Sequence, residues 1–189
     1  MDTVNKPKMD KKTFSLVVVA GTASYLDSSL LVSLGVALPI WTKLMHLTPL
    51  ITGFISTLLT LMVALGSVTG GWLSDRFGRV RVFNLDILFV AIGALVIAFA
   101  PNLTILLIGT IIAGLASGAD LPTSLAVISE RTSDKMYGRC ITITQIFWTV
   151  GILLSQFIGF LTSGMTVGSV RWIFGVIALV AFTNWCVRA

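Results

Sequence analysis

Six long apolar stretches, separated by short polar or charged segments, run along the 189-residue chain. A bilayer core about 30 Å thick is crossed by roughly 20 apolar residues in a helix, and each stretch is close to this length or longer. The predicted spans are residues 14–40, 50–73, 83–100, 103–128, 140–163 and 171–187. The pattern therefore predicts an all-α membrane protein with six transmembrane helices.

The composition supports an integral membrane protein. Hydrophobic residues make up 56% of the chain and charged residues 11%, with a mean hydropathy of +0.97, whereas soluble domains carry about 25% charged residues. So little polar surface cannot cover a water-soluble body. The net charge of +5 comes from short basic clusters and not from the continuous basic face that nucleic-acid binding needs. We expect the lipid bilayer as a partner and no nucleic acid.

The positions of Lys and Arg predict the orientation, because cytoplasmic loops carry the excess of these residues. With a cytoplasmic N-terminus, the outer side holds only Lys43 and Arg171. The inner side then holds Lys6, Lys8, Lys11, Lys12, Arg76, Arg79, Arg81, Arg131, Lys135, Arg139 and Arg188. We therefore expect both termini in the cytoplasm, residues 1–12 as a cytoplasmic segment, and residues 13–189 as a bundle in the cell (inner) membrane.

A charged loop joins the second and third spans. Its glycine, acidic and basic positions are Gly71, Asp75, Arg76, Gly78 and Arg79. This order resembles the signature loop Gly-x-x-x-Asp-Arg-x-Gly-Arg of the major facilitator superfamily, which lies at the same place between helices two and three. In that family such a loop latches the two halves of the transporter together, so the resemblance implies a conformational latch here.

The same residues have a physical interpretation of their own. We expect Gly71 to allow close helix approach, Asp75 to accept hydrogen bonds from a neighbouring helix N-terminus, and Gly78 to supply the turn. Arg76 and Arg79 would hold the topology and pair with acids on facing elements. The alternative is a solvated basic hairpin that serves only the orientation of the chain.

A second resemblance covers the fourth and fifth spans and the first. The matching positions are Gly114, Gly118, Glu130, Gly138, Arg139 and Gln145, with Leu26, Asp27, Gly35 and Pro39 in the first span. They resemble the sugar-porter and metabolite-proton symporter branches of the superfamily. The resemblance implies the N-terminal six-helix half of a twelve-helix transporter, built as a 3+3 inverted repeat. Thr110 stands where the fourth helix often carries Arg, and the fifth helix lacks the Gly-Pro pair of drug-proton antiporters.

Three carboxylates fall within or beside apolar spans. A charged carboxylate at the bilayer centre costs about 2.5–3.5 kcal/mol on insertion scales, so it persists there when it is protonated, paired or facing a wet cavity. We predict that Asp27 carries a coupled proton and that Asp120 assists, since the resemblance makes their helices counterparts beside the central cavity. The alternative is a hydrogen bond that only holds helices together. For Asp86 we expect a contact with Arg79 or Arg81.

A polar stripe on the fifth span is the candidate substrate surface. Thr142, Gln145, Thr149 and Gln156 recur at helical spacing and so share one face. We predict that Gln145, Thr149 and Gln156 bind substrate, together with Trp148 beside them and Tyr25 on the first span. Glutamine both donates and accepts hydrogen bonds and suits a solute rich in hydroxyl or carboxylate groups. The alternative is contact between helices, for which Gln and Thr are common.

The sequence thus predicts a proton-coupled importer of a sugar or small organic acid that works by alternating access. The resemblance implies a second six-helix half or a second copy, and we expect the chain to be a truncated half. An efflux antiporter of the same superfamily and a non-transporting scaffold or sensor are the alternatives. We expect no enzyme activity, no cofactor and no metal site, since one His and two distant Cys cannot build an ordinary zinc site.

Overall fold

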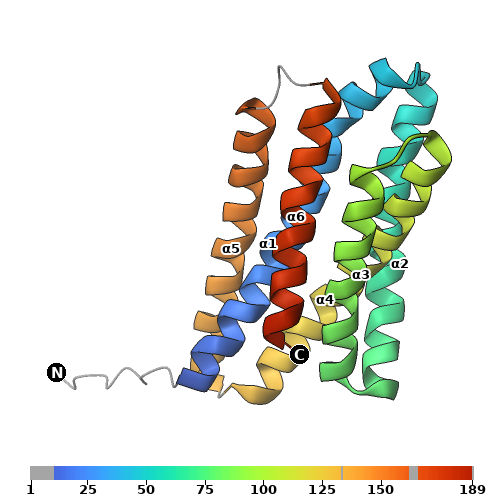
Figure 1. Ribbon diagram of the computed structural model, residues 1–189. Helices are drawn as coiled ribbons and strands as arrows, with labels where there is room; N and C mark the ends of the chain where they lie inside the picture. The colour runs from blue at the N-terminus through green and yellow to red at the C-terminus, as the bar shows by residue number, and fades with distance from the viewer. Residues whose placement is uncertain (1–10, 133, 162–165, 189) are drawn as a thin grey trace.

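The computed structural model describes residues 11–132, 134–161 and 166–188, and these form six α-helices (Figure 1). Their bounds are α1 Lys11–Leu44, α2 Pro49–Phe77, α3 Arg79–Ala98, α4 Leu103–Arg131, α5 Asp134–Leu161 and α6 Thr166–Arg188. All six are long and apolar enough to cross a membrane, which confirms the six predicted spans. Most of the expected N-terminal segment and the predicted end of the fifth span near residue 163 lie outside the described residues.

Local sequence signals fix several helix ends. The Thr48 side chain accepts a hydrogen bond from the Ile51 amide at the start of α2, where Pro49 is the first helical residue. Asn102 accepts one from the Ile105 amide at the start of α4. Such caps satisfy amides that have no partner inside the helix. Gly78 ends α2 and precedes α3 with a φ of +94°, a backbone conformation that glycine adopts without steric cost.

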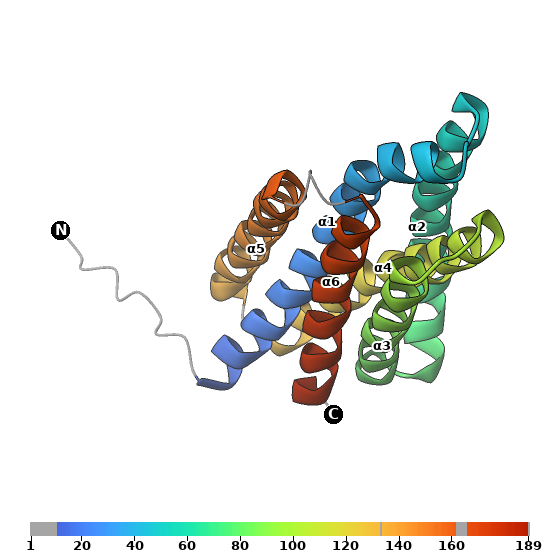
Figure 2. The ribbon, with the colours of Figure 1, turned by 45° about the horizontal axis from the view of Figure 1, so that its top comes forward.

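The helices are arranged as two related sets of three. α2 packs mainly along α4, and α5 packs mainly along α1. In Figures 1 and 2, α5 and α2 lie on opposite sides of the bundle, with α1 and α6 between them. Exchanging the first three helices for the last three turns the α2–α4 contact into the α5–α1 contact, as an inverted repeat requires. The expected fold class is therefore confirmed.

Glycines bring the paired helices unusually close. A methyl group added at Gly118 of α4 would lie 2.8 Å from the Val63 carbonyl carbon of α2, and one added at Gly66 of α2 would lie 2.9 Å from that of Leu115. The corresponding methyl at Gly151 of α5 would lie 2.5 Å from the Tyr25 carbonyl oxygen of α1. Small residues that let two backbones touch are typical of membrane helix interfaces.

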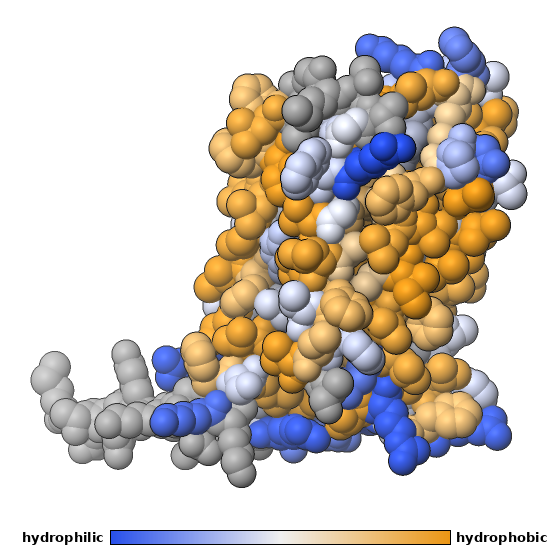
Figure 3. All heavy atoms as spheres, viewed as in Figure 1, coloured by the Kyte–Doolittle hydropathy of each residue, from blue (hydrophilic) through white to orange (hydrophobic). Residues whose placement is uncertain are grey.

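The outer surface is apolar over most of its height. Figure 3 shows hydrophobic side chains covering the middle of the bundle, while hydrophilic residues gather toward its two ends. Large side chains such as Leu153, Phe157, Leu179 and Phe182 are more than half exposed. Exposed apolar area of this extent marks a surface that contacts lipid or another protein, and the chain is a multi-pass membrane protein.

Candidate functional site

Asp27 lies at the middle of α1, inside the bundle. Only 2% of the residue is exposed, and the Ser117 hydroxyl of α4 donates a hydrogen bond of 2.5 Å to its Oδ1 atom. Both residues sit near the centres of helices longer than 28 residues. The carboxyl group therefore faces the contact between α1 and α4 and does not point at lipid.

The neighbouring serines of α1 hold α5 in place. The Ser29 hydroxyl donates to the Gly151 carbonyl of α5 at 3.3 Å, and the Ser155 hydroxyl of α5 donates to the Ser29 carbonyl at 3.5 Å. These bonds satisfy buried polar groups that would otherwise cost about 1–3 kcal/mol each. As a result, the segment that carries Asp27 is fixed between α4 on one side and α5 on the other.

Two more carboxyl groups, of Asp120 and Asp86, are buried toward the charged-loop end of the bundle. Asp120 of α4 is 1% exposed and Asp86 of α3 is 4% exposed. The Thr123 hydroxyl of α4 donates to Asp86 Oδ2 at 3.1 Å. Arg79 pairs with Asp75 and Glu130 at the helix ends, and the expected contact of Asp86 with Arg79 or Arg81 stays a prediction.

The predicted substrate residues of α5 face away from the bundle. Gln145, Thr149 and Gln156 are exposed, whereas Trp148 and Tyr25 are half-buried. The Thr149 hydroxyl donates to the Gln145 carbonyl of its own helix at 3.1 Å. Within the described part of the chain, the Gln145 and Gln156 side chains bond to no other helix. They are therefore displayed on an outer face, while Asp27 is covered by packing in this conformation.

A matching stripe on α2 was not expected from the sequence. Gly53, Thr57, Thr60 and Ala64 follow one another in steps of four and three residues, and all four are exposed. They lie opposite the α2 face, including Gly66, that packs on α4. The stripe is made of small residues, and its two hydroxyls bond to their own helix backbone. The span around it is as hydrophobic as the other five, so the sequence does not indicate it. The role of Ser117 was also not predicted, because a single serine in an apolar span does not indicate which residue it contacts.

Arg79 connects three helix ends at the charged loop. Its Nη2 atom lies 3.2 Å from Asp75 Oδ1 at the end of α2, and its Nη1 atom lies 3.0 Å from Glu130 Oε1 near the end of α4. Asp75 is thus bonded to a guanidinium and not, as expected, to a helix N-terminus. The Arg76 guanidinium lies 5.4 Å from the centre of the Trp72 ring, so in the described chain it contacts an aromatic ring and not an acid.

For the two glycines of the charged loop, one prediction is confirmed and one is wrong. Gly78 supplies the turn with its positive φ. Gly71 does not mediate close helix approach, because a methyl group there would meet nothing within 4 Å, and Gly70 makes that approach against Ala119 instead. Gly138 and Arg139 are exposed near the start of α5, and their proposed role in the loop between α4 and α5 stays a prediction.

The fold and these contacts define a class: a polytopic helical bundle of two inverted three-helix units with a carboxyl group buried at mid-span. The family model of the Major Facilitator Superfamily matches residues 16–188. The chain belongs to this superfamily, a family of membrane transporters and not an enzyme class.

Known relatives and structures are similar over most of the chain. The minor myo-inositol transporter IolF of Bacillus subtilis is 27% identical over 173 residues, which are 90% of this chain and 40% of IolF. The niacin transporter NiaP of Acinetobacter baylyi is 38% identical over 114 residues, covering 60% of this chain and 26% of NiaP. The chain thus spans less than half the length of these relatives. The inward-open xylose transporter XylE of E. coli superimposes with a TM-score of 0.84 at 17% identity, over 93% of this chain and 47% of XylE.

Proposed function

We propose that this six-helix bundle forms half of a transporter that moves a small polar solute, a sugar or organic acid, together with protons by alternating access. Support comes from the transporter relatives, among them a galactose-proton symporter of Escherichia coli that is 37% identical over 119 residues, which are 62% of this chain and 25% of that protein. The bundle would sit in the inner membrane with both termini in the cytoplasm.

The observation that carries the proposal is the hydrogen bond between Ser117 and Asp27 at the middle of α1 and α4. A carboxyl group at this depth is costly and serves transport when it gains and loses a proton. The ionised Asp27 carboxylate can only accept a hydrogen bond from Ser117, whereas the protonated carboxyl group can also donate one. Each protonation change therefore alters the contact between two helices that would move against a second bundle. Asp120, buried in the same helix as Ser117, would assist this step.

The polar faces of α2 and α5 support a second bundle opposite this one. Both faces are exposed here and lie on the two helices with the smallest buried share of their apolar segments. A second bundle docked against them would enclose a path between the halves. Gln145, Thr149 and Gln156 would then line that path and bind hydroxyl or carboxylate groups of the solute, with Trp148 and Tyr25 at its edge. Asp75, Arg79 and Glu130 would act as the latch at its cytoplasmic end.

The test compares two buried carboxylates in the assembly that the chain forms in cells, reconstituted into liposomes. Galactose, myo-inositol and niacin are offered as solutes under an imposed pH gradient. We expect Asp27→Asn to abolish accumulation against the gradient while exchange of labelled for unlabelled solute continues. Asp86→Asn is the matched control, because Asp86 is also buried but accepts its hydrogen bond from Thr123 and not from Ser117. Equal accumulation in wild type and Asp27→Asn would reject the role of Asp27.

Efflux is the second candidate. A multidrug resistance protein B homolog of Mycobacterium tuberculosis is 34% identical over 117 residues, which are 60% of this chain and 21% of that protein. In efflux by antiport, protons enter the compartment with the higher pH while the solute leaves it. In symport the solute enters that compartment together with the protons. The direction of solute movement in the same liposomes separates the two candidates.

A further inference from the structure

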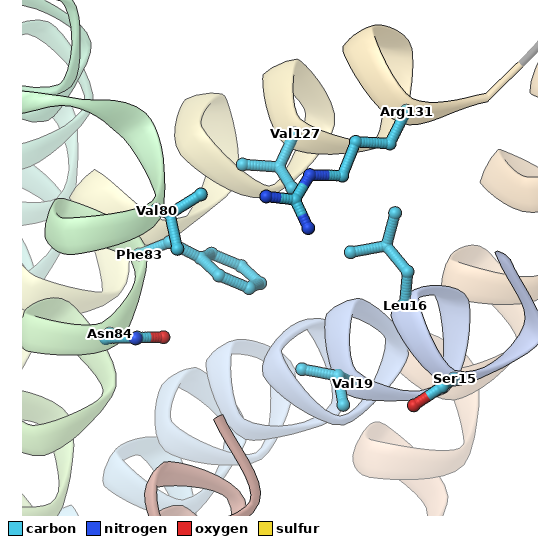
Figure 4. Close-up of a pocket in the computed structure, with 8 residues that line it drawn as sticks. All are labelled: Ser15, Leu16, Val19, Val80, Phe83, Asn84, Val127 and Arg131. Atoms are coloured by element: carbon cyan, nitrogen blue, oxygen red, sulfur yellow. The ribbon is translucent and has the colours of Figure 1, made fainter. Parts of the chain in front are cut away.

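A cavity of about 360 Å³ opens at the end of the bundle that carries the charged loop, between α1, α3 and α4. Its polar lining comes from Ser15 of α1, Asn84 of α3 and Arg131 of α4, and its apolar lining includes Leu16, Phe83 and Val127 (Figure 4). The cavity lies inside one bundle and is separate from the outer faces of α2 and α5.

Arg131 is the chemically informative residue of this cavity. Figure 4 shows its side chain extending over the opening, with the guanidinium turned toward Phe83 and Leu16. Among the residues that the structure describes, Arg131 forms no ion pair or hydrogen bond, and no carboxylate lines the cavity. By contrast, Arg79 nearby is held by two acids. A guanidinium presents two parallel N–H donors that match the oxygens of a carboxylate or phosphate.

The remaining lining residues restrict the ligand further. Ser15 lines the cavity from α1, while Leu16, Phe83 and Val127 offer hydrocarbon surface near the guanidinium (Figure 4). The cavity lies within two turns of the ends of α1, α3 and α4, which is the depth of lipid head groups in the proposed orientation. A ligand with an anionic head and an apolar body satisfies both kinds of surface.

We propose that this cavity binds an amphiphilic anion, with its phosphate or carboxylate on Arg131 and its hydrocarbon part against Phe83 and Leu16. The ligand comes either from the bilayer, as an anionic phospholipid, or from the cytoplasm, as a short-chain carboxylate. Bound there, it ties α1 to α4 beside the ion pair of Glu130 with Arg79. Binding requires no transport, so its failure leaves the proposed function untouched.

The test measures the thermal unfolding midpoint of the full chain in dodecyl maltoside during titration with phosphatidylglycerol, octanoate or phosphatidylcholine. We expect phosphatidylglycerol or octanoate to raise the midpoint saturably, and zwitterionic phosphatidylcholine to have no such effect at equal concentration. A rise with phosphatidylglycerol alone identifies the bilayer as the source. A rise with octanoate shows that a soluble carboxylate suffices.

Three variants decide whether the cavity is the site. Arg131→Gln should weaken binding about tenfold or more, because a charged hydrogen-bonding partner is lost. Ser15→Phe keeps the guanidinium but fills the opening from an exposed position, and should weaken binding as strongly. Arg81→Gln removes an equally exposed charge outside the cavity lining and should change the affinity less than twofold. Equal loss in Arg131→Gln and Arg81→Gln, or no saturable rise with either anion, overturns the proposal.

Discussion

The contact between α2 and α4 makes a quantitative prediction about two glycines. A methyl group at Gly118 would lie 2.8 Å from the Val63 carbonyl carbon, and ordinary contacts begin at 3.4 Å. The Val63 carbonyl oxygen lies closer still. The obstacle is backbone, so no side-chain rotation relieves it, and the helices must separate locally. Overpacking of this kind costs about 1–3 kcal/mol. Gly71 of α2 has nothing within 4 Å of its added methyl, which makes Gly71→Ala the matched control.

The comparison between the two variants removes the effect of helix propensity. Replacing Gly by Ala in a helix stabilises it by up to about 1 kcal/mol, and this gain is shared by both variants. Gly118→Ala should therefore be less stable than Gly71→Ala by about 2 kcal/mol in the free energy of unfolding. Reversible unfolding in mixed detergent and SDS micelles, followed by circular dichroism, measures this difference.

A double variant sharpens the same test. Gly66 meets Leu115 on the facing side of this contact, so one separation of the helices relieves both clashes. The double variant of Gly66→Ala and Gly118→Ala should lose less stability than the two single variants together. Equal stability of Gly118→Ala and Gly71→Ala would refute the close approach of α2 and α4.

Three further predictions concern the loop and the buried carboxyl. Gly78→Ala should destabilise the bundle by about 1–2 kcal/mol in the same unfolding assay, because φ is +94° there and a Cβ atom opposes that conformation. Arg79→Gln should change stability by less than about 1 kcal/mol, since its ion pairs are solvent-exposed; a double-mutant cycle with Glu130→Gln measures their coupling, and a larger coupling would contradict this estimate. Ser117→Ala should lower pH-driven solute accumulation while Ser117→Thr, which keeps the hydroxyl that meets Asp27, preserves most of it; equal uptake by both would exclude a role for the hydrogen bond.

The fold could be predicted from the sequence because its signals are long and repeated. Four helices contain their predicted spans, whereas α3 begins before residue 83 and ends at Ala98, before the predicted residue 100, and α5 begins before residue 140 and is described to Leu161. The turns between helices coincide with local signals such as Gly78 and the Asn102 cap. The burial of Asp27 and Asp120 also followed from the cost of a carboxylate in lipid. The six spans followed from the hydropathy pattern of a single sequence, whereas the inverted repeat was implied by the resemblance to the superfamily.

The contacts of the site could not be predicted in the same way. Ser117 meets Asp27 across 90 positions of the chain, and nothing in either segment specifies how two helices are rotated about their axes. The same uncertainty led to Gly71 in place of Gly70 as the close contact, since neighbouring glycines face different directions. In the sequence, Arg131 is one of several basic residues at helix ends. Its cavity is lined by residues of three separate helices, so the sequence alone could not predict it.

The central claim is that Asp27 carries the proton that is coupled to solute movement. The most direct measurement is solute-driven proton uptake into liposomes that contain the reconstituted assembly, recorded with a pH-sensitive dye inside. We expect the lumen to acidify when solute is added to the wild type and to Asp86→Asn, and not with Asp27→Asn, although solute exchange continues. Acidification by Asp27→Asn at the rate of the wild type would contradict the account.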